Sequence, residues 1–370
     1  MKKKTISFLL TTHQLNVAYN NRLQYRAQGL VVGGYDVSMI SLFPVKLINR
    51  YRIPLITVCN YRRNAISLFI GLFKSIKTLR KLDYLIVDSK NILLLAWYML
   101  LKSFFHYKIL HEQTEWLFLN KTGGNKLTLW MYKQLCRRIY GITVISEALA
   151  LFYKSLGVGE DRIYKLPMLI DPSPFIDKKS AEVEEDYIAY CGEMNNNKDG
   201  IDDLIEAFDI FSHKVSGVKL YLIGDTSDKS QYESYTGKVL EKRLNDRVVF
   251  TGRVPHESMP HYLSNAKILV LARPDNEQAQ KGFPSKLGEY LATGNPVVIT
   301  RTGDIDKYLI DGRDCFFVKP GNPSAFADKL YEVICNYERA MEVGRAGKQK
   351  VFHEFNYVVQ MRKMIEFFDK

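Results

Sequence analysis

The chain has 370 residues, of which 46% are hydrophobic and 25% are charged, and this composition excludes disordered and fibrous proteins. Its length favours two domains. The net charge of +12 is unevenly spread: residues 1–179 hold 27 Lys and Arg against 10 Asp and Glu, whereas residues 180–370 hold 25 against 30. The first part therefore carries +17 and the second −5. This asymmetry indicates an anionic partner of the first part, such as a membrane surface, nucleic acid or a phosphorylated substrate. The alternative is charge that only maintains solubility.

The cysteines and the apolar runs bear on the compartment. The five cysteines have no C-x-x-C spacing and predict neither disulfides nor a zinc site, which favours the cytoplasm: Cys59, Cys136, Cys191, Cys315 and Cys335. The start, MKKKTISFLL, resembles a signal peptide, but its apolar run ends at Leu10 without a cleavage site and predicts a buried strand. The run 92–101 is about half the length that spans a bilayer and predicts a core helix, with an interfacial helix as the alternative.

Apolar strand patterns alternate with helical patterns along the whole chain. In the first half the predicted strands are 4–10, 35–42, 84–88, 107–111 and 142–146. In the second half they are 187–191, 218–223, 247–251, 267–272, 296–300 and 314–318. Continuous apolar runs indicate strands that are buried on both faces, as in parallel sheets covered by helices. We therefore predict an α/β protein with two Rossmann-like, doubly wound domains, whose ligands bind at the carboxyl ends of the strands.

The segment 280–300 (QKGFPSKLGEYLATGNPVVIT) is the strongest local pattern. Gly282 and Pro284 predict a tight loop, and Ser285 is the expected N-cap of a helix over 286–293. A loop of this kind presents free backbone N–H groups and the positive end of a helix dipole, which suits a phosphate.

Two charged residues extend this pattern. Lys286 adds a mobile positive charge at the helix start, and Glu289 lies one turn further on the same face as Ser285. A carboxylate there can accept hydrogen bonds from the two hydroxyls of a ribose. The alternative is a surface helix in which Lys286 and Glu289 form an ordinary i,i+3 ion pair.

This segment resembles the donor-binding motif of the retaining glycosyltransferases of family four, which have the GT-B fold. Gly282, Phe283 and Glu289 match the family's pattern, as does the run 292–298. In the family a first Glu stands eight residues before the second and contacts hydroxyls of the donor sugar, but this chain has Lys281 there. The side chains that remain open for that role are Glu277, Gln278 and Gln280.

The segment 190–208 resembles the family's Gly-Arg…Lys-Gly stretch, which opens the second domain. The resemblance implies that Lys198 contacts the pyrophosphate. Glu193 replaces the family's Arg, so one phosphate contact must come from elsewhere, with Lys281 and Lys286 as candidates. The alternative for Lys198 is a solvated loop lysine.

Three further segments match in order. In 248–272 the resemblance places Val254 at a turn whose backbone reads the nucleotide base, with Arg253 beside the site or simply on the surface. Residues 144–175 resemble the family's approach to the linker. Residues 355–370 resemble its last helix, which returns to pack on the first domain.

The first domain supplies the remaining candidates. Residues 108–116 place His111 and Glu112 just after a strand, where the family keeps a His near the reacting sugar and the acceptor. A histidine at a strand end is otherwise more often structural. The first loop, 11–24, departs from the family's paired glycines, and its candidates for acceptor or phosphate contacts are His13, Asn16 and Arg22.

The resemblance implies a domain division and a reaction. The N-terminal, acceptor-binding domain would comprise 1–175 plus 354–370, the nucleotide-sugar-binding domain 185–353, and the linker 171–186, which contains two prolines. A hexose-type sugar would pass with retention from a nucleotide-diphosphate donor to a glycan or lipid-linked acceptor of bacterial envelope polysaccharide synthesis.

The same resemblance assigns the site residues. The helix start, Lys286 and Lys198 would stabilise the leaving diphosphate without a metal or other cofactor, and His111 would orient the donor sugar or shape the acceptor pocket. The predicted catalytic residues are His111, Glu289 and Lys286. The predicted donor-binding residues are Lys198, Arg253, Val254, Lys281, Gly282, Phe283, Pro284, Ser285, Lys286 and Glu289. The predicted acceptor-binding residues are His13, Asn16, Arg22 and Glu112.

A basic, amphipathic segment suggests how the first domain meets its acceptor. Residues 65–81 predict a helix with one apolar face, comprising Ile66, Phe69, Ile70, Phe73 and Ile76. Basic residues crowd around it: Arg50, Arg52, Arg62, Arg63, Lys74, Lys77, Arg80 and Lys81. This pattern suits a peripheral protein on the inner face of the cytoplasmic membrane, bound to anionic lipid. The alternative is a helix that packs on the first sheet.

Other functions remain open. A GT-B-fold nucleotide-sugar epimerase would share the architecture but need no acceptor. A basic, non-catalytic protein that binds nucleic acid would explain the charge, but the chain lacks the aromatic and basic motifs of known readers, so we expect no nucleic-acid partner. A degenerate, inactive transferase would explain Lys281 and Glu193.

Overall fold

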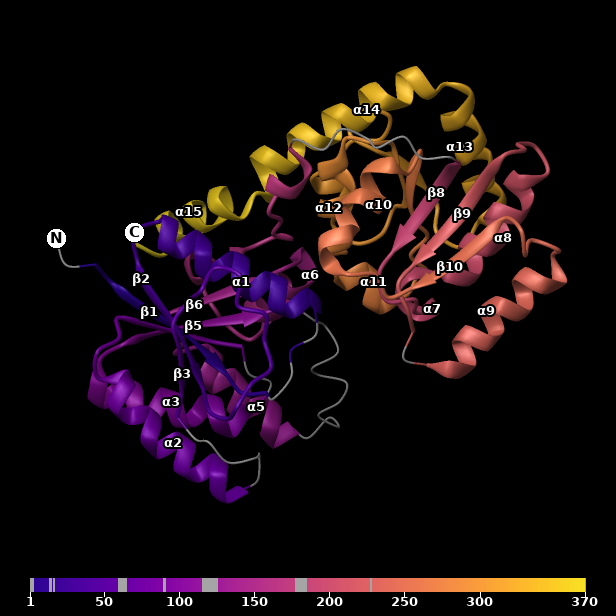
Figure 1. The fold of residues 1–370 in the computed structure, drawn as a ribbon. Coiled ribbons are helices and arrows are strands. Elements are labelled where there is room, and N and C mark those ends of the chain that lie inside the picture. The colour runs from indigo at the N-terminus through magenta and orange to yellow at the C-terminus, as the bar shows by residue number, and fades with distance from the viewer. Residues whose placement is uncertain are drawn as a thin grey trace. The chain divides into compact units, whose positions relative to one another are not determined.

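The computed structural model describes residues 3–12, 15, 17–58, 65–88, 91–114, 126–176, 185–226 and 228–369. The chain divides into two compact units, and the first contains the C-terminal helix as well as the N-terminal part (Figure 1). Unit 1 comprises Met1–Leu169 and Tyr357–Lys370, and unit 2 comprises Ile170–Asn356.

Unit 1 contains a seven-stranded sheet in the order β3-β2-β1-β4-β5-β6-β7, with every neighbouring pair parallel. Its strands are β1 (Thr5–Leu10), β2 (Asp36–Ser41), β3 (Leu55–Thr57), β4 (Tyr84–Val87), β5 (Lys108–Gln113), β6 (Gly141–Val144) and β7 (Ile163–Lys165). The five strands predicted for this half are confirmed. The sequence did not predict β3 and β7, because three-residue edge strands are too short for a hydrophobic pattern.

Helices cover both faces of this sheet, with α1 and α15 on one face and α2, α3 and α5 on the other (Figure 1). The helices of unit 1 are α1 (Val17–Val32), α2 (Ala65–Leu79), α3 (Ile92–Phe105), α5 (Lys126–Cys136), α6 (Glu147–Ser155) and α15 (Tyr357–Phe368). A 3-10 turn, Glu160–Arg162, precedes β7. The doubly wound arrangement is therefore confirmed for this half.

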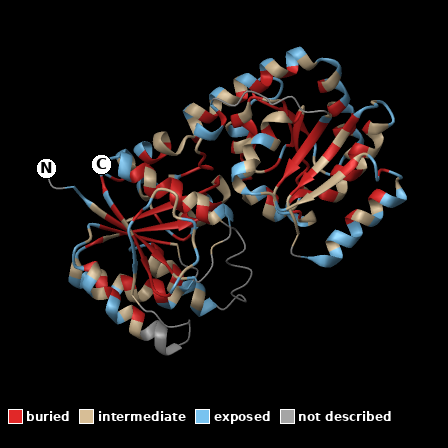
Figure 2. Cartoon of the chain, viewed as in Figure 1, coloured by how far each residue is buried: buried red, intermediate tan, exposed pale blue. Residues whose placement is uncertain are grey.

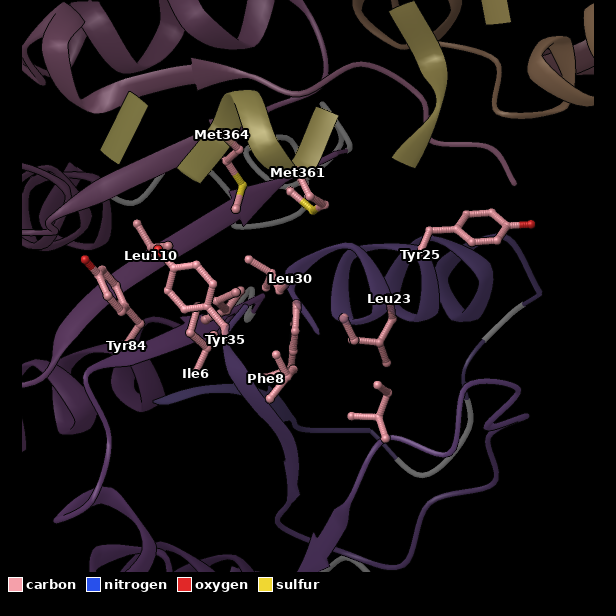
Figure 3. Packing of buried hydrophobic residues seen from close by; sticks show 14 of the residues in the cluster. Ile6, Phe8, Leu23, Tyr25, Leu30, Tyr35, Tyr84, Leu110, Met361 and Met364 are labelled. Carbon is pink, nitrogen blue, oxygen red and sulfur yellow. The ribbon is translucent and has the colours of Figure 1, made fainter. Parts of the chain in front are cut away.

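The C-terminal helix α15 packs into the core of unit 1, as predicted. Met361 and Met364 lie against β1 and α1 (Figure 3). Two glycines permit this close approach: a Cβ on Gly29 would lie 2.4 Å from Cγ of Met361, and one on Gly141 would lie 2.1 Å from the ring of Phe368. Larger residues at these two positions would push the helix away from the sheet.

The carboxylate of Asp369 ties the end of α15 to the sheet. It accepts hydrogen bonds from Lys4 at 2.8 Å, Tyr35 at 2.8 Å and Tyr84 at 3.0 Å. Burial alone would raise the pKa of Asp369, but these three donors lower it overall because they favour the charged form.

Unit 2 contains a six-stranded parallel sheet in the order β10-β9-β8-β11-β12-β13. Its strands are β8 (Asp186–Cys191), β9 (Val218–Ile223), β10 (Val248–Gly252), β11 (Ile268–Leu271), β12 (Val297–Thr300) and β13 (Phe316–Val318). All six match predicted strands to within one or two residues at each end. β8, β11 and β12 are buried almost throughout, as the continuous apolar runs required (Figure 2).

The helices of unit 2 form two groups. α8 lies beside α9 and α13, whereas α12 lies beside α10 and α14. The α-helices of this unit are α7 (Asn196–Asp199), α8 (Ile201–Ser212), α9 (Lys229–Glu241), α10 (Met259–Asn265), α11 (Glu277–Lys281), α12 (Lys286–Thr293), α13 (Pro323–Cys335) and α14 (Tyr337–Lys350). A π-helical turn, Val351–Phe355, ends this unit. None of the described helices is long and apolar enough to cross a membrane.

Candidate functional site

The loop before α12 and the start of that helix lie in unit 2, beside the carboxyl end of β8. α12 covers the predicted residues, Lys286–Thr293, and ends at Gly294 in the left-handed conformation. The hydroxyl of Tyr290 fixes the helix to β8. It accepts a hydrogen bond from the backbone N–H of Cys191 at 2.6 Å and donates one to the carbonyl of Cys191 at 3.1 Å. Burial and the nearby carboxylate of Glu289 raise the pKa of the Cys191 thiol to about 12.

Two residues of this loop behave differently from the prediction. Ser285 precedes the helix, but its side chain makes no capping hydrogen bond, so the N-cap interaction we expected is wrong. The ring of Phe283 is buried and packs against Tyr308 and Phe355, with ring centroids 5.5 and 6.1 Å away. Phe283 therefore anchors the loop, and only the backbone of this residue remains for a ligand.

Lys286 is held in place rather than mobile, which corrects the prediction. Its ammonium lies 2.7 Å from the carboxylate of Asp199 and donates to the hydroxyl of Tyr190 at 2.9 Å. Asp199 also accepts from the Tyr190 hydroxyl at 3.0 Å. Burial lowers the pKa of Lys286, and Asp199 opposes that shift. Asp199, rather than Glu289 in an i,i+3 pair, is thus the observed ion-pair partner of Lys286.

Glycines bring the strand ends and Lys286 together. A Cβ on Gly192 would lie 2.6 Å from Nζ of Lys286, and a Cβ on Gly224 would lie 2.0 Å from the carbonyl oxygen of Gly192. Both glycines have positive φ angles, 151° and 132°. Lys286 therefore lies against the residue that precedes Glu193, where the family's arginine is missing. Lys286 is one of the two lysines suggested to replace that arginine, and its contact with a phosphate stays a prediction.

Lys198 lies beside this cluster on α7. Asn195 caps α7 by accepting from the N–H of Lys198, and the lysine side chain is exposed. Gly200 follows at φ 65°, and a Cβ there would lie 1.8 Å from the carbonyl oxygen of Ala272. This close approach sets Lys198 and Asp199 against the end of β11.

The sequence analysis did not single out Arg273, the second residue after β11. Its side chain is buried, with the residue 2% exposed, and its Nε donates to the carbonyl of Lys198 at 3.4 Å. Its Nη1 is buried with no hydrogen-bond partner among the described residues. Burial lowers the pKa of Arg273 to about 10, and the carboxylate of Asp199 partly offsets this. The only signal in the sequence was a charged residue at the carboxyl end of an apolar strand.

Lys281, which stands in place of the family's first Glu, pairs with Glu277 one turn earlier on α11. Gln280 is also engaged, because its amide accepts from the N–H of Gly303 at 2.9 Å and donates to Asp275 at 2.7 Å. Of the three side chains left open for sugar recognition, Gln278 is the one without a hydrogen bond to the described residues.

Arg253 and Val254 follow β10 at the same edge of the sheet. Arg253 is exposed, and its Nε lies 3.5 Å from the carboxylate of Asp225, which follows β9. An exposed ion pair at this distance contributes little to stability, so Arg253 is free to exchange its partner. The candidate donor residues of unit 2 thus gather at the carboxyl ends of β8, β9, β10 and β11.

In unit 1 the structure gives two predicted acceptor residues different partners. Glu112 is only 2% exposed, and its carboxylate accepts from Nε of Arg22 at 2.9 Å and from Nη1 of Arg26. Arg22 also donates to the carbonyls of Pro167 at 2.8 Å and Leu166 at 3.0 Å. These groups neutralise one another inside the unit, and their predicted contact with an acceptor stays a prediction.

His111 is also enclosed by protein. Its Nδ1 donates to the carbonyl of Val87 at 2.8 Å, and its Nε2 lies 3.2 Å from the hydroxyl of Tyr132. Burial lowers the pKa of His111, partly offset by the hydrogen bond to Val87, so the neutral ring with the proton on Nδ1 fits these contacts. A direct contact with a sugar stays a prediction.

The remaining predicted residues lie outside this description. His13 and Asn16 are not among the described residues. Within the described ranges, no group of three or more His, Cys, Asp and Glu side chains is arranged to hold a metal ion.

Unit 2 matches a known family. Residues 185–336 match the family model described as glycosyl transferases group 1. The chain is 29% identical over 171 residues to the capsular polysaccharide biosynthesis glycosyltransferase CapM of Staphylococcus aureus, which covers 46% of this chain and 42% of that protein. It is 23% identical over 192 residues to the lipopolysaccharide 1,2-N-acetylglucosaminetransferase of Salmonella typhimurium, which covers 50% of this chain and 49% of that protein. The chain thus spans less than half of the length of these curated relatives.

The solved structures agree with the observed architecture. The Anabaena protein Alr3699/HepE in complex with UDP has a TM-score of 0.80 at 14% identity, with 99% of each chain covered. The same protein in complex with UDP-glucose has a TM-score of 0.75 at 14% identity, with 98% of each chain covered. At such low identity this likeness establishes the fold alone. The chain therefore has the GT-B fold, and its residues 185–336 match the glycosyl transferases group 1 family.

Proposed function

We propose that this protein is a retaining glycosyltransferase, which moves a hexose-type sugar from a nucleotide-diphosphate donor to a glycan or lipid-linked acceptor. Unit 2 would bind the donor and unit 1 the acceptor. Two of the curated relatives are a capsular polysaccharide biosynthesis glycosyltransferase and a lipopolysaccharide 1,2-N-acetylglucosaminetransferase, and bacterial envelope polysaccharide synthesis is therefore the process we propose.

One observation carries the proposal: Lys286 and the N-terminus of α12 lie against Gly192 at the carboxyl end of β8. Parallel α/β sheets bind ligands at this edge, and a helix N-terminus with a cation beside it suits a diphosphate. Lys198 adds a second, exposed cation on α7. These groups would stabilise the negative charge that develops on the leaving diphosphate.

Glu289 is the proposed ribose ligand. It lies one turn into α12, so its carboxylate follows the phosphate-binding helix start on the same face. Gln278 is the proposed replacement for the family's first Glu, because the other two side chains considered for that role are engaged in hydrogen bonds and ion pairing. We propose no metal-dependent step, since the cations of the chain itself lie where the diphosphate would bind.

The first test is a thermal-shift panel of nucleotide sugars, with UDP-glucose included because a structural neighbour binds it. A ligand at ~100 times its Kd should add ~2.7 kcal/mol of stability. If none of the nucleotide sugars in the panel stabilises the protein, the proposal is wrong. A stabilising donor that is consumed only when an acceptor is added separates a transferase from an epimerase.

Glu289→Ala tests the donor site directly. We expect it to abolish most of the transfer while the fold stays intact, because Glu289 is half-buried on α12 and its carboxylate is not part of the hydrophobic core. The matched control is Glu338→Ala, at the start of the neighbouring helix α14. Full activity in the Glu289 variant would refute the assignment.

We also propose that unit 1 contacts an anionic membrane surface. On α3, Leu93, Leu100 and Phe104 lie on one side of the helix and are 72%, 55% and 66% exposed. On the neighbouring helix α2, where burial is described from residue 70 onward, Gly71, Ser75 and Leu79 are buried, whereas Phe73 of the predicted apolar face is 47% exposed. Apolar groups with basic neighbours suit an anionic leaflet.

The basic residues beside these apolar groups are exposed as well, namely Lys74, Lys77, Arg80 and Lys81. A vesicle flotation assay that compares anionic with neutral lipid tests the proposal. Leu100→Ser with Phe104→Ser should weaken flotation, whereas Leu240→Ser, which changes an equally exposed leucine of unit 2, should not. Flotation without preference for anionic vesicles would remove the membrane proposal.

A further inference from the structure

We propose that Arg273 is an additional diphosphate-binding residue, whose guanidinium takes an anionic oxygen of the donor beside the loop that precedes α12. The inference rests on the proposed function, since the diphosphate is that of a nucleotide sugar. It goes beyond that function because neither the sequence motifs nor the proposed roles above use Arg273.

The placement of Arg273 is fixed by backbone contacts on two sides. On one side, Gly200 lies so close to Ala272 that a residue with a side chain would not fit there. The carbonyl of Lys198 lies 3.4 Å from Nε of Arg273 on the same side. On the other side, a Cβ on Gly282 would lie 3.7 Å from Nη2 of Arg273. The guanidinium therefore lies between α7 and the loop that leads into α12.

The hydrogen bonds of Arg273 are incomplete within the described chain. One long bond, from Nε to a carbonyl, serves a group with five N–H donors, and the buried Nη1 has no partner among the described residues. The hydroxyl of Thr302 is also buried without a partner there. Thr302 borders the same loop, because a Cβ on the next residue, Gly303, would lie 2.9 Å from the carbonyl of Gly282.

The charges around Arg273 also favour an anionic ligand, because the positive groups there outnumber the negative ones. Asp199 acts electrostatically on both Arg273 and Lys286, but its carboxylate is already paired with Lys286 at 2.7 Å and hydrogen-bonded to Tyr190. The buried Arg273 and the partly buried Lys286 thus share one buried carboxylate, and Lys198 adds a third positive charge close by. A buried charge needs a counter-charge and hydrogen bonds, which an anionic oxygen supplies together.

A purely structural arginine in the same unit looks different. Arg247 donates to the carbonyl of Val218 from Nε at 3.0 Å and from Nη2 at 2.7 Å, and to the carbonyl of Val215 at 3.0 Å. Its guanidinium also lies over the ring of Phe208. Arg247 precedes β10, so it lies at the opposite edge of the sheet from Arg273, and it is the matched control.

The experiment measures binding of inorganic pyrophosphate, UDP and UDP-glucose to the full chain by calorimetry. We expect Arg273→Gln to raise the Kd of all three at least about tenfold, and Arg273→Lys to restore part of the loss because it keeps the charge. Arg247→Gln should lower the melting temperature but leave each Kd within about twofold. The lysine variant keeps the test valid if Arg273→Gln does not fold.

The outcomes separate the inference from the proposed function. Equal affinities in the wild type and a folded Arg273 variant would overturn the inference while the donor site stands. A loss confined to UDP-glucose would also overturn it, because the contact would then be to the sugar. Pyrophosphate binding that depends on Arg273, with no nucleotide sugar bound by the wild type, would support the anion site and refute the glycosyltransferase proposal. Absence of binding of all three ligands to the wild type would overturn the inference, and the wider panel of nucleotide sugars would then decide the proposed function.

Discussion

One arginine in each unit, the largely enclosed Arg22 and the buried Arg273, lies near the carboxyl ends of the strands, and the surroundings of the two differ. In unit 1, Arg22 makes three hydrogen bonds of 2.8–3.0 Å, one of them to the buried carboxylate of Glu112. In unit 2, Arg273 makes one bond of 3.4 Å within the described chain, and Asp199 is already paired with Lys286. Burial lowers the pKa of both arginines. At Arg22 the carboxylate of Glu112 is the strongest influence that opposes this shift.

The comparison indicates how buried charges divide between structure and binding. A charge that the protein itself neutralises and hydrogen-bonds stabilises the fold, and its removal leaves a partner uncompensated. A charge that the protein leaves under-bonded is more stable with a ligand present than without. Arg22 and Glu112 belong to the first kind, and Arg273 belongs to the second.

The largest effect is expected from Glu112→Gln, which breaks the ion-pair cluster of Glu112, Arg22 and Arg26 in unit 1. Arg22 and Arg26 would lose the carboxylate that neutralises both, so we expect the free energy of unfolding to fall by about 3–5 kcal/mol in urea titrations. Glu160→Gln, at an exposed ion pair with Lys154, is the control and should change little. A stable Glu112→Gln protein would show that the cluster is not structural.

Asp199→Asn should have the next largest effect. It should lower the stability of the ligand-free protein but strengthen the binding of pyrophosphate. Without ligand, Lys286 and Arg273 lose their shared carboxylate, so we expect a loss of roughly 3 kcal/mol in unfolding experiments. Because the anion would no longer compete with Asp199, pyrophosphate should bind roughly tenfold more tightly, about 1.4 kcal/mol. Asp202→Asn, which breaks the ion pair with Lys238 on α9, is the control. Weaker pyrophosphate binding in Asp199→Asn would contradict the excess of positive charge.

The smallest effect is expected from the titration of His111, whose buried ring in unit 1 is neutral. Its pKa is lower in the folded protein than in the unfolded chain, so its contribution to stability is complete above about pH 6.5 and is lost as the pH falls through the folded value. The loss should reach at most ~1.4 kcal/mol per pH unit. His111→Gln should flatten this slope in unfolding curves, and the exposed His261→Gln should not. A slope that is unchanged in His111→Gln would assign the acid sensitivity to other groups.

Much of the fold followed from local patterns. Apolar runs located eleven of the thirteen strands in the described ranges, and the helix in 286–293 was predicted from its loop and its terminal glycine. The two missed strands, β3 and β7, are three residues long, and their pairing depends on neighbours far along the chain. Local pattern cannot report such pairing.

The site was predicted less completely, because partners in a site come from distant segments. Lys286 was correctly placed at the helix start, yet its partners, Asp199 and Tyr190, stand nearly a hundred residues earlier. Glu112 was predicted just after a strand and Arg22 in the loop after the first strand, whereas the structure places them in β5 and α1. Their mutual ion pair joins residues 90 positions apart, and no spacing rule predicts it.

The sequence by itself determined the two parallel sheets, the returning C-terminal helix and the resemblance of the second half to a known family, since hydrophobic periodicity and short motifs are local properties. It also located the positive charge in the first half. Only the tertiary structure decided which charged residues are neutralised inside the protein and which are left for a ligand. The physical reason is that desolvation and pairing depend on what surrounds a side chain in space, and glycine contacts such as Gly192 with Lys286 bring those surroundings together across the chain.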